Sequence, residues 1–126
     1  GSFLLLAYAP NPNPNPRPIA GLLGVTWGTR GFYSYGASDY SHRALMAPYL
    51  LQWEAMKLCR ARGCTTYDLL GIAPGGSKFQ VSGFWAGVTR FKLQFGGNVE
   101  RYPPEQEGVL RPFVGWLFSL KRALLR

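Results

Sequence analysis

Three short segments combine charged, aromatic and small residues in spacings that could support chemistry. The first, Tyr33 to Ala44, passes from two tyrosines through glycine to Asp39 and Arg43. A strand that leads through glycine into a helix presents free backbone N–H groups and the positive end of the helix dipole. This junction could bind a phosphate or carboxylate with help from Arg43. The alternative is an ordinary helix cap formed by Asp39 or a neighbouring serine.

The second segment, residues 65–71, reads Thr-Thr-Tyr-Asp-Leu-Leu-Gly and places Asp68 near the end of a predicted strand. Ligands of open α/β sheets gather beyond the carboxyl ends of the strands. Asp68 could therefore orient an amine or accept its proton, although a single aspartate at such a position more often caps a loop.

The third segment, residues 87–97, carries a cation on each side of Phe91 and ends on two glycines. Arg90, Phe91 and Lys92 could combine phosphate contact with stacking on a base or ribose. The alternative is a solvated cationic helix face with Phe91 and Phe95, four residues apart, in the core.

The sequence lacks the residue combinations of common hydrolases. It has one histidine, His42, and no Ser-His-Asp, Cys-His or His-Glu-x-x-His arrangement. Cys59 and Cys64 have neither metal-site nor redox-motif spacing, so we predict buried, inert thiols. Catalysis would therefore depend on positioning and electrostatic stabilisation, without a metal or a covalent intermediate.

Hydrophobic periodicity predicts the elements that position these segments. The expected elements are strands at 3–9, 19–28, 32–36, 65–70 and 98–102, a central helix from residue 41 to Gly63, a helix within 83–96, and a final helix from Pro112. The first strand is expected to be buried and joined to an antiparallel second strand by an exposed Pro/Asn loop at 10–17. The fold class is therefore mixed α/β.

Further details follow from single residues. A tight turn is expected at 29–31, and strand alternation should place Tyr33 and Tyr35 on one face, where aromatic pairs usually pack across strands. The strand after the central helix should run parallel to the strand before it. Pro48 would cost about 3 kcal/mol or kink the central helix unless it lies in its first turn or two.

Length and charge restrict the possible partners. A chain of 126 residues can form one domain with a core, and its net charge of +8 favours phosphate-bearing partners such as nucleic acid, nucleotide-linked metabolites or an anionic membrane surface. The first apolar run is too short to span a membrane and does not have the form of a signal peptide. Two unpaired thiols suit a reducing cytoplasm. A strand at the very start predicts that upstream sequence is missing.

Four motifs in register carry a family resemblance. They are Tyr-Gly-Ala-Ser-Asp at 35–39, Arg-Ala-Leu-Met-Ala-Pro-Tyr-Leu-Leu-Gln-Trp-Glu-Ala-Met at 43–56, Gly-Cys-Thr-Thr-Tyr-Asp at 63–68 followed by Gly71-Ile72, and Phe-Lys-Leu-Gln-Phe-Gly-Gly at 91–97. Over about residues 18–103, the chain resembles the C-terminal half of the Fem-type (FemABX) peptidoglycan bridge-forming peptidyltransferases. The resemblance implies a GNAT-like acyltransferase fold in a single domain, 1–126, whose C-terminal helix, within 108–126, packs on a missing or partner domain.

The resemblance also implies a function. The family transfers an amino acid from aminoacyl-tRNA to the stem peptide of a nucleotide- or lipid-linked peptidoglycan precursor in the cytoplasm, without metal or coenzyme A. Phe91 and Lys92 match a Phe-Lys pair associated with the tRNA end and with charge developing on the ester carbonyl, so they are the expected catalytic residues. The expected substrate-binding residues are Tyr33, Tyr35, Arg43, Asp68 and Arg90.

Other functions stay open at this point. A coenzyme-A-dependent N-acetyltransferase would need a pyrophosphate loop that the sequence lacks. A non-catalytic RNA-binding module needs only the basic surface and the aromatics. Residues 113–126 could instead form a cationic amphipathic helix at a membrane surface. We also expect the fragment to be inactive alone and to form homodimers through its C-terminal helix, whose apolar face would lack its partner.

Overall fold

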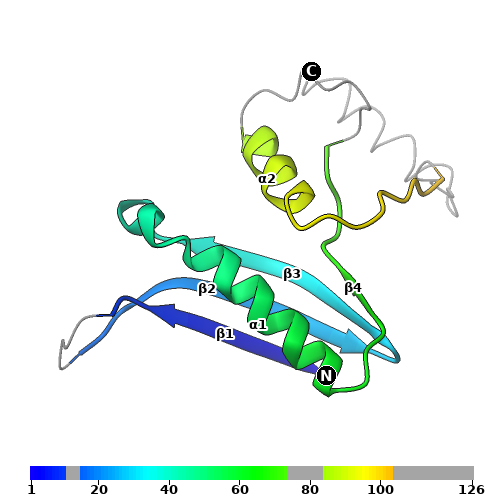
Figure 1. Ribbon diagram of the computed structural model, residues 1–126, viewed down its shortest axis with the longest axis horizontal. Helices are drawn as coiled ribbons and strands as arrows, with labels where there is room; N and C mark the ends of the chain where they lie inside the picture. The colour runs from blue at the N-terminus through cyan, green and yellow to red at the C-terminus, as the bar shows by residue number, and fades with distance from the viewer. Residues whose placement is uncertain (11–14, 74–83, 104–126) are drawn as a thin grey trace, which may run out of the picture. The chain divides into compact units, whose positions relative to one another are not determined.

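The computed structural model describes residues 1–10, 15–73 and 84–103. In chain order the elements are β1 (Ser2–Tyr8), β2 (Pro18–Trp27), β3 (Arg30–Ser38), the 3-10 helix η1 (Tyr40–Leu45), α1 (Ala47–Ala61), β4 (Thr66–Asp68) and α2 (Phe84–Leu93) (Figure 1). The chain divides into two compact units, 1–96 and 97–126, and all of these elements belong to the first. The prediction of a single domain over the whole chain stays a prediction.

One mixed sheet organises the first unit. Its strand order is β1-β2-β3-β4, with antiparallel pairs β1–β2 and β2–β3 and a parallel pair β3–β4. The parallel pair is joined through α1, because a parallel connection needs a crossover longer than a hairpin turn. The predicted mixed α/β fold and the parallel strand after the central helix are confirmed.

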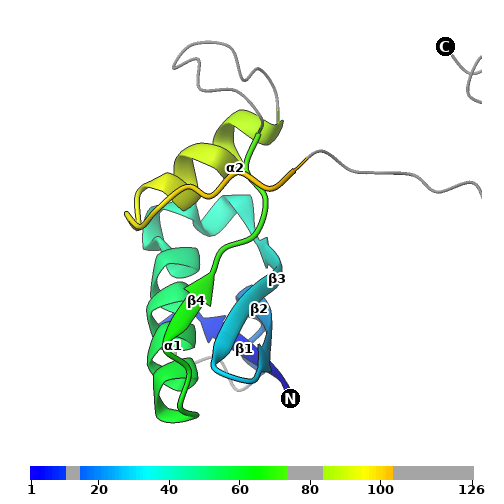
Figure 2. The same ribbon diagram turned by 90° about the vertical axis from the view of Figure 1, so that its right-hand side faces the viewer.

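The core lies between the sheet and α1, which covers one sheet face (Figure 2). Leu22 of β2 is 2% exposed, and Leu51 and Ala55 of α1 are also buried. In α1 the buried residues recur at helical spacing, which turns one stripe of the helix toward the strands. Burial of the apolar side chains of this stripe stabilises the packing of α1 on the sheet.

The other sheet face is apolar and exposed, and we call it the open face. It is defined by Leu4, Leu6, Leu23 and Tyr35. Leu4, Leu23 and Tyr35 lie opposite one another on three adjacent strands and are 62%, 37% and 74% exposed. The prediction that the first strand is wholly buried is therefore wrong, because only alternate β1 residues reach the core.

The β2–β3 hairpin turns earlier than expected. Trp27 pairs with Arg30, so only Gly28 and Thr29 lie in the turn. Gly28 has a φ of +55°, a value that glycine adopts without the penalty other residues incur. The predicted turn at 29–31 is corrected accordingly.

The predicted central helix is two helices. Met46 has a φ of +53° and separates η1 from α1. Pro48 then lies in the first turn of α1, where its missing N–H costs no helical hydrogen bond. The chain thus avoids the penalty of an internal proline by beginning a new helix.

The end of α1 brings the two cysteines into proximity. Gly63 has a φ of +83°, the Cys64 N–H donates to the Cys59 carbonyl at 3.0 Å, and the Gly63 N–H donates to Arg60. This is a Schellman cap, in which the residue after glycine packs against the last helical turn. Both thiols are free. Cys59 is buried, and burial raises its pKa and keeps it protonated. Cys64 is half-buried, so the prediction of two buried thiols is wrong for Cys64.

The remaining predictions have mixed outcomes. The strand expected at 65–70 is limited to Thr66–Asp68, and the helix expected within 83–96 forms as α2. No strand forms at 98–102, so that prediction is wrong. The central part of the Pro/Asn loop and the final helix lie outside the described residues. Within the described ranges, no helix is both long and apolar enough to cross a membrane.

Candidate functional site

Lys92, near the end of α2, is the most unusual charged residue among those described. Its side chain is only 9% exposed, and its Nζ donates a 2.7 Å hydrogen bond to the Gly71 carbonyl oxygen. The same Nζ lies 5.7 Å from the centre of the Tyr33 ring, within range of a cation–π contact. Desolvation lowers the pKa of Lys92, and the nearby charge of Asp68 acts in the opposite direction.

Helix α2 is held against the start of α1 by an aromatic cluster. The Phe91 ring packs edge-on against Tyr49 and Phe95, at centroid distances of 5.0 and 5.2 Å. The Tyr49 hydroxyl also donates a hydrogen bond to Gln94. Phe91 therefore contributes packing that fixes the helix from which Lys92 projects.

The loop after β4 supplies the acceptor for Lys92. Asp68, at the end of the strand, accepts a 2.7 Å hydrogen bond from the Leu70 N–H, and Leu70 has a φ of +58°. The carboxylate thus holds a tight turn whose next residue, Gly71, presents its carbonyl oxygen to the ammonium. The loop-capping role considered for Asp68 is present, and its charge also influences Lys92.

A β-bulge separates the two tyrosines of β3. Tyr33 pairs with Gly24 and Tyr35 pairs with Leu23, so Ser34 is an extra residue in the ladder. Residues directly opposite one another project to the same face. Tyr33 therefore lies on the core side with Lys92, whereas Tyr35 lies on the open face, and the prediction that they share a face is wrong.

Burial keeps the inward tyrosine neutral. Desolvation raises the pKa of Tyr33, so its phenol retains its proton at physiological pH. The neutral ring attracts the Lys92 ammonium through its quadrupole. Its apolar surface also restricts the access of water to the ammonium.

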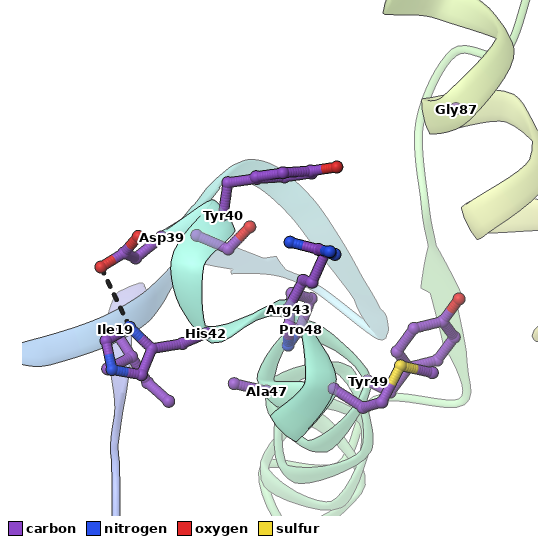
Figure 3. A pocket seen from close by; sticks show the side chains of 11 residues that line it. Ile19, Asp39, Tyr40, His42, Arg43, Ala47, Pro48, Tyr49 and Gly87 are labelled. Atoms are coloured by element: carbon purple, nitrogen blue, oxygen red, sulfur yellow. Dashed lines mark hydrogen bonds and ion pairs between the residues drawn. The ribbon is translucent and has the colours of Figure 1, made fainter.

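A separate pocket of about 450 Å³ lies beside η1 and the start of α1 (Figure 3). Arg43 extends into it with its guanidinium 4.5 Å from the centre of the Tyr40 ring, and Tyr49 also lines it. Figure 3 shows Arg43 on the side facing Gly87, and Asp39 bonded to His42 on the opposite side of η1. Lys92 does not line this pocket.

The junction before η1 caps itself. The Asp39 carboxylate accepts hydrogen bonds from the Ser41 N–H at 2.9 Å and from the Ser41 hydroxyl at 2.7 Å. These bonds, followed by one involving His42, lower the pKa of Asp39. Of the two interpretations for this junction, the structure therefore contains the aspartate cap, which places a carboxylate where an anionic ligand would bind.

The predicted site residues fall into distinct places. Tyr33 and Asp68 surround Lys92, and Phe91 secures the helix beside it. Arg43 lines the pocket instead. The other two expected residues, Tyr35 and Arg90, are exposed and make none of these contacts.

Three contributors were missed by reasoning from the sequence. The Gly71 carbonyl could not be identified because a backbone acceptor leaves no mark on the residue type. Tyr49 looked like one more apolar position of a helix, yet it both lines the pocket and packs on Phe91. Gln52, whose side-chain oxygen accepts a hydrogen bond from the Tyr67 hydroxyl of β4, could have been detected, because a glutamine on the buried stripe of a helix requires a hydrogen-bond partner.

The Lys92 environment can stabilise developing negative charge. A lysine ammonium has three donors, and within the described residues the Gly71 carbonyl accepts one of them. The remaining donors can serve an oxyanion, and low exposure strengthens such an interaction. Within the described ranges, no cluster of three metal-ligating side chains is present.

Comparisons with known proteins agree with this fold. The FemAB family matches residues 10–117. Lipid II:glycine glycyltransferase of Staphylococcus haemolyticus is 34% identical over 83 residues, covering 65% of this chain and 19% of that protein. The protein of the same name from Staphylococcus epidermidis is 38% identical over 53 residues, or 42% of this chain and 13% of that protein. The crystal structure of FemX is similar with a TM-score of 0.54 and 29% identity, covering 63% of this chain and 19% of FemX. The chain thus spans no more than 19% of the length of these relatives.

Proposed function

Because this chain belongs to the FemAB family, we propose that it is part of a transferase that joins an amino acid to the stem peptide of a peptidoglycan precursor. We further propose that aminoacyl-tRNA is the donor and that the acceptor is a lipid- or nucleotide-linked precursor. The names of the relatives, which specify lipid II and glycine, support this class of reaction. The likeness to FemX supports the same assignment at the level of the fold.

The observation that carries the proposal is the restrained ammonium of Lys92. In the reaction, the acceptor amine attacks the ester carbonyl of the donor, a C–N bond forms and the C–O bond to the ribose breaks. The amine loses a proton and the ribose hydroxyl gains one, so Lys92 returns to its starting state. Its role is to donate hydrogen bonds to the carbonyl oxygen while that oxygen carries negative charge.

The surrounding residues have supporting roles in this proposal. Tyr33 bounds the ammonium on one side and Asp68 fixes the turn that presents Gly71. Phe91 holds α2 in place through Tyr49. Arg43 is suited to a phosphate of the precursor, since it is an exposed cation that lines a pocket.

The two exposed residues, Arg90 and Tyr35, have no described contact with the Lys92 ammonium and are assigned separately in this proposal. Arg90 lies on the exposed side of α2, where it is suited to contact tRNA phosphates beyond the reacting end. Tyr35 lies on the open face and has no role in the step at Lys92. We place the reaction in the cytoplasm, where charged tRNA is found. The homodimer and the membrane contact remain predictions, because both depend on the segment after residue 103.

Binding of a donor mimic tests the proposal. The probe is a short acceptor-stem RNA carrying glycine at its 3′ end through a stable amide, compared with the same RNA uncharged and with acetyl-coenzyme A. We expect the 126-residue chain to prefer the charged RNA and Lys92→Ala to weaken that binding at least tenfold, or about 1.4 kcal/mol. Lys57→Ala is the matched control, because Lys57 is an exposed lysine paired with Glu54.

The alternatives give different results. Equal binding of charged and uncharged RNA indicates an RNA-binding module, and tight binding of acetyl-coenzyme A indicates an N-acetyltransferase. Equal losses in Lys92→Ala and Lys57→Ala would show that only overall charge is recognised, which contradicts the role given to Lys92.

A further inference from the structure

Two residues of β3 that are three apart in sequence face the same side of the sheet. Tyr33 pairs with Gly24, and Gly36 pairs with Leu22, which is in the core. In a regular strand, residues three apart project to opposite faces. Here the bulge adds Ser34 to the strand, and this extra residue places Tyr33 on the same face as Gly36.

The Tyr33 side chain occupies the space above Gly36. A Cβ added at Gly36 would overlap the Tyr33 phenol oxygen and come within 2.9 Å of the ring carbon that bears it. The backbone at Gly36 is held in the ladder opposite Leu22 and needs no positive φ. The group that would have to move is therefore the Tyr33 ring, not the strand.

Movement of Tyr33 would reach Lys92 directly. The Tyr33 ring is 5.7 Å from the Lys92 ammonium, and the described contacts of that ammonium are this ring and the Gly71 carbonyl. A displaced ring would remove one of the two contacts and admit water beside a side chain that is now 9% exposed. The orientation of the Lys92 ammonium therefore depends on the absence of a side chain at Gly36 of β3.

We propose that Gly36 is a positioning residue for Lys92: its missing side chain is the space in which Tyr33 lies, and Tyr33 in turn fixes the ammonium. The proposal rests on the function given to Lys92, but the geometric link between the three residues can be tested without any substrate. It also gives a physical reason for glycine at this place in the Tyr-Gly-Ala-Ser-Asp motif.

The test is a set of four variants of the whole chain: Gly36→Ala, Tyr33→Phe, the double variant Gly36→Ala/Tyr33→Phe, and Gly21→Ala as the matched control. Gly21 lies on β2, and its added Cβ would meet the tip of Leu6 at 3.3 Å and the Leu5 carbonyl oxygen at 3.9 Å. The first measurement is the urea midpoint of unfolding. The second is the pKa of Lys92, which is measured from the ¹³Cε chemical shift of labelled lysine as a function of pH.

We expect Gly36→Ala to lower the urea midpoint and to raise the pKa of Lys92 toward its ordinary value, because water reaches the ammonium. Removing the hydroxyl in the double variant relieves its overlap with the added Cβ and leaves the ring carbon at 2.9 Å, so part of both changes should be recovered. Gly21→Ala should leave the pKa of Lys92 unchanged. If Gly36→Ala unfolds the chain, the double variant still decides the matter, because without the hydroxyl the ring needs a smaller shift to clear the added Cβ.

Two outcomes would overturn the proposal. One is an unchanged Lys92 pKa in a folded Gly36→Ala variant; the other is a double variant no better than Gly36→Ala alone, which would place the strain in the backbone. Both readouts are independent of the donor-binding assay. A failure of donor binding with a positive result here would refute the proposed reaction and leave the positioning relationship intact.

Discussion

The Tyr67 hydroxyl donates a hydrogen bond of 2.9 Å to the side-chain oxygen of Gln52, linking the parallel strand β4 to helix α1. Gln52 is 1% exposed, so its oxygen has no access to solvent as a substitute. The bond fixes β4 against the helix just before the turn that presents Gly71. One polar contact in the core thereby connects the fold to the surroundings of Lys92.

Removal of this hydroxyl should destabilise the chain. In Tyr67→Phe the Gln52 oxygen loses its partner in the core, and we expect a loss of about 1–3 kcal/mol in the free energy of unfolding. Urea denaturation measures it, with Tyr40→Phe as an exposed control that should change little. A loss no larger than that of the control would show that water replaces the hydroxyl.

The same tyrosine should make stability sensitive to alkaline pH. Burial, followed by the charges of Cys59 and Tyr33, raises the pKa of Tyr67 above its ordinary value of 10.0. A raised folded-state pKa gives a contribution that is complete below pH 10 and is lost as pH rises above it. The stability advantage of wild type over Tyr67→Phe should therefore shrink from pH 10 upward, as urea titrations at fixed pH can show. A constant difference would mean that the phenol does not titrate differently in the folded state.

Lys92 should have the opposite dependence. Desolvation lowers its folded-state pKa below 10.5, so between the lowered value and 10.5 the unfolded chain binds more protons and stability rises with pH. We expect wild type to gain stability relative to Lys92→Met as pH is raised toward 10.5. A flat difference for Lys92→Met would contradict the desolvated ammonium.

Two adjacent leucines of β2 should respond very differently to truncation. Leu22 is in the core and Leu23 is on the open face. We expect Leu22→Ala to cost about 2–5 kcal/mol, because it removes buried contacts and leaves a cavity. Leu23→Ala should cost less than about 1 kcal/mol. Chemical denaturation of the two variants measures the difference, and similar losses would indicate that the open face is covered in solution.

Replacement of Met46 by glycine should stabilise the folded chain. Its φ of +53° is unfavourable for a residue with a Cβ, and its side chain is exposed. We expect Met46→Gly to raise the free energy of unfolding by up to about 1 kcal/mol. Leu50→Gly, at an exposed position inside α1, should instead lower it by about 1 kcal/mol. A thermal melt of both variants is sufficient, and a loss in Met46→Gly would argue that the break between η1 and α1 is not formed.

Much of the fold could be predicted from patterns along the chain. The four strands β1 to β4, the helical stripe of α1 and the parallel placement of β4 follow from periodicity and connection rules, which can be applied along the chain. Gly63 marked the end of α1 for the same local reason. The positions of Phe91 and Lys92 on a helix also followed, and the family resemblance was confirmed by the match over residues 10–117.

The orientations of individual side chains could not be predicted in this way. Strand alternation put Tyr33 and Tyr35 on one face, but the bulge at Ser34 reverses that relationship, and a bulge depends on pairing with another strand. Helical spacing likewise predicted one continuous helix across Met46. In the structure the positive φ of Met46 ends one helix, and Pro48 lies in the first turn of the next. By itself, the sequence determined the four strands of the sheet, the presence of helix in the α1 and α2 regions, and which residue types are available for chemistry. Only the tertiary structure decided that Tyr33, Gly71 and Lys92 meet, because a cation–π contact and a backbone acceptor arise between segments distant in the chain.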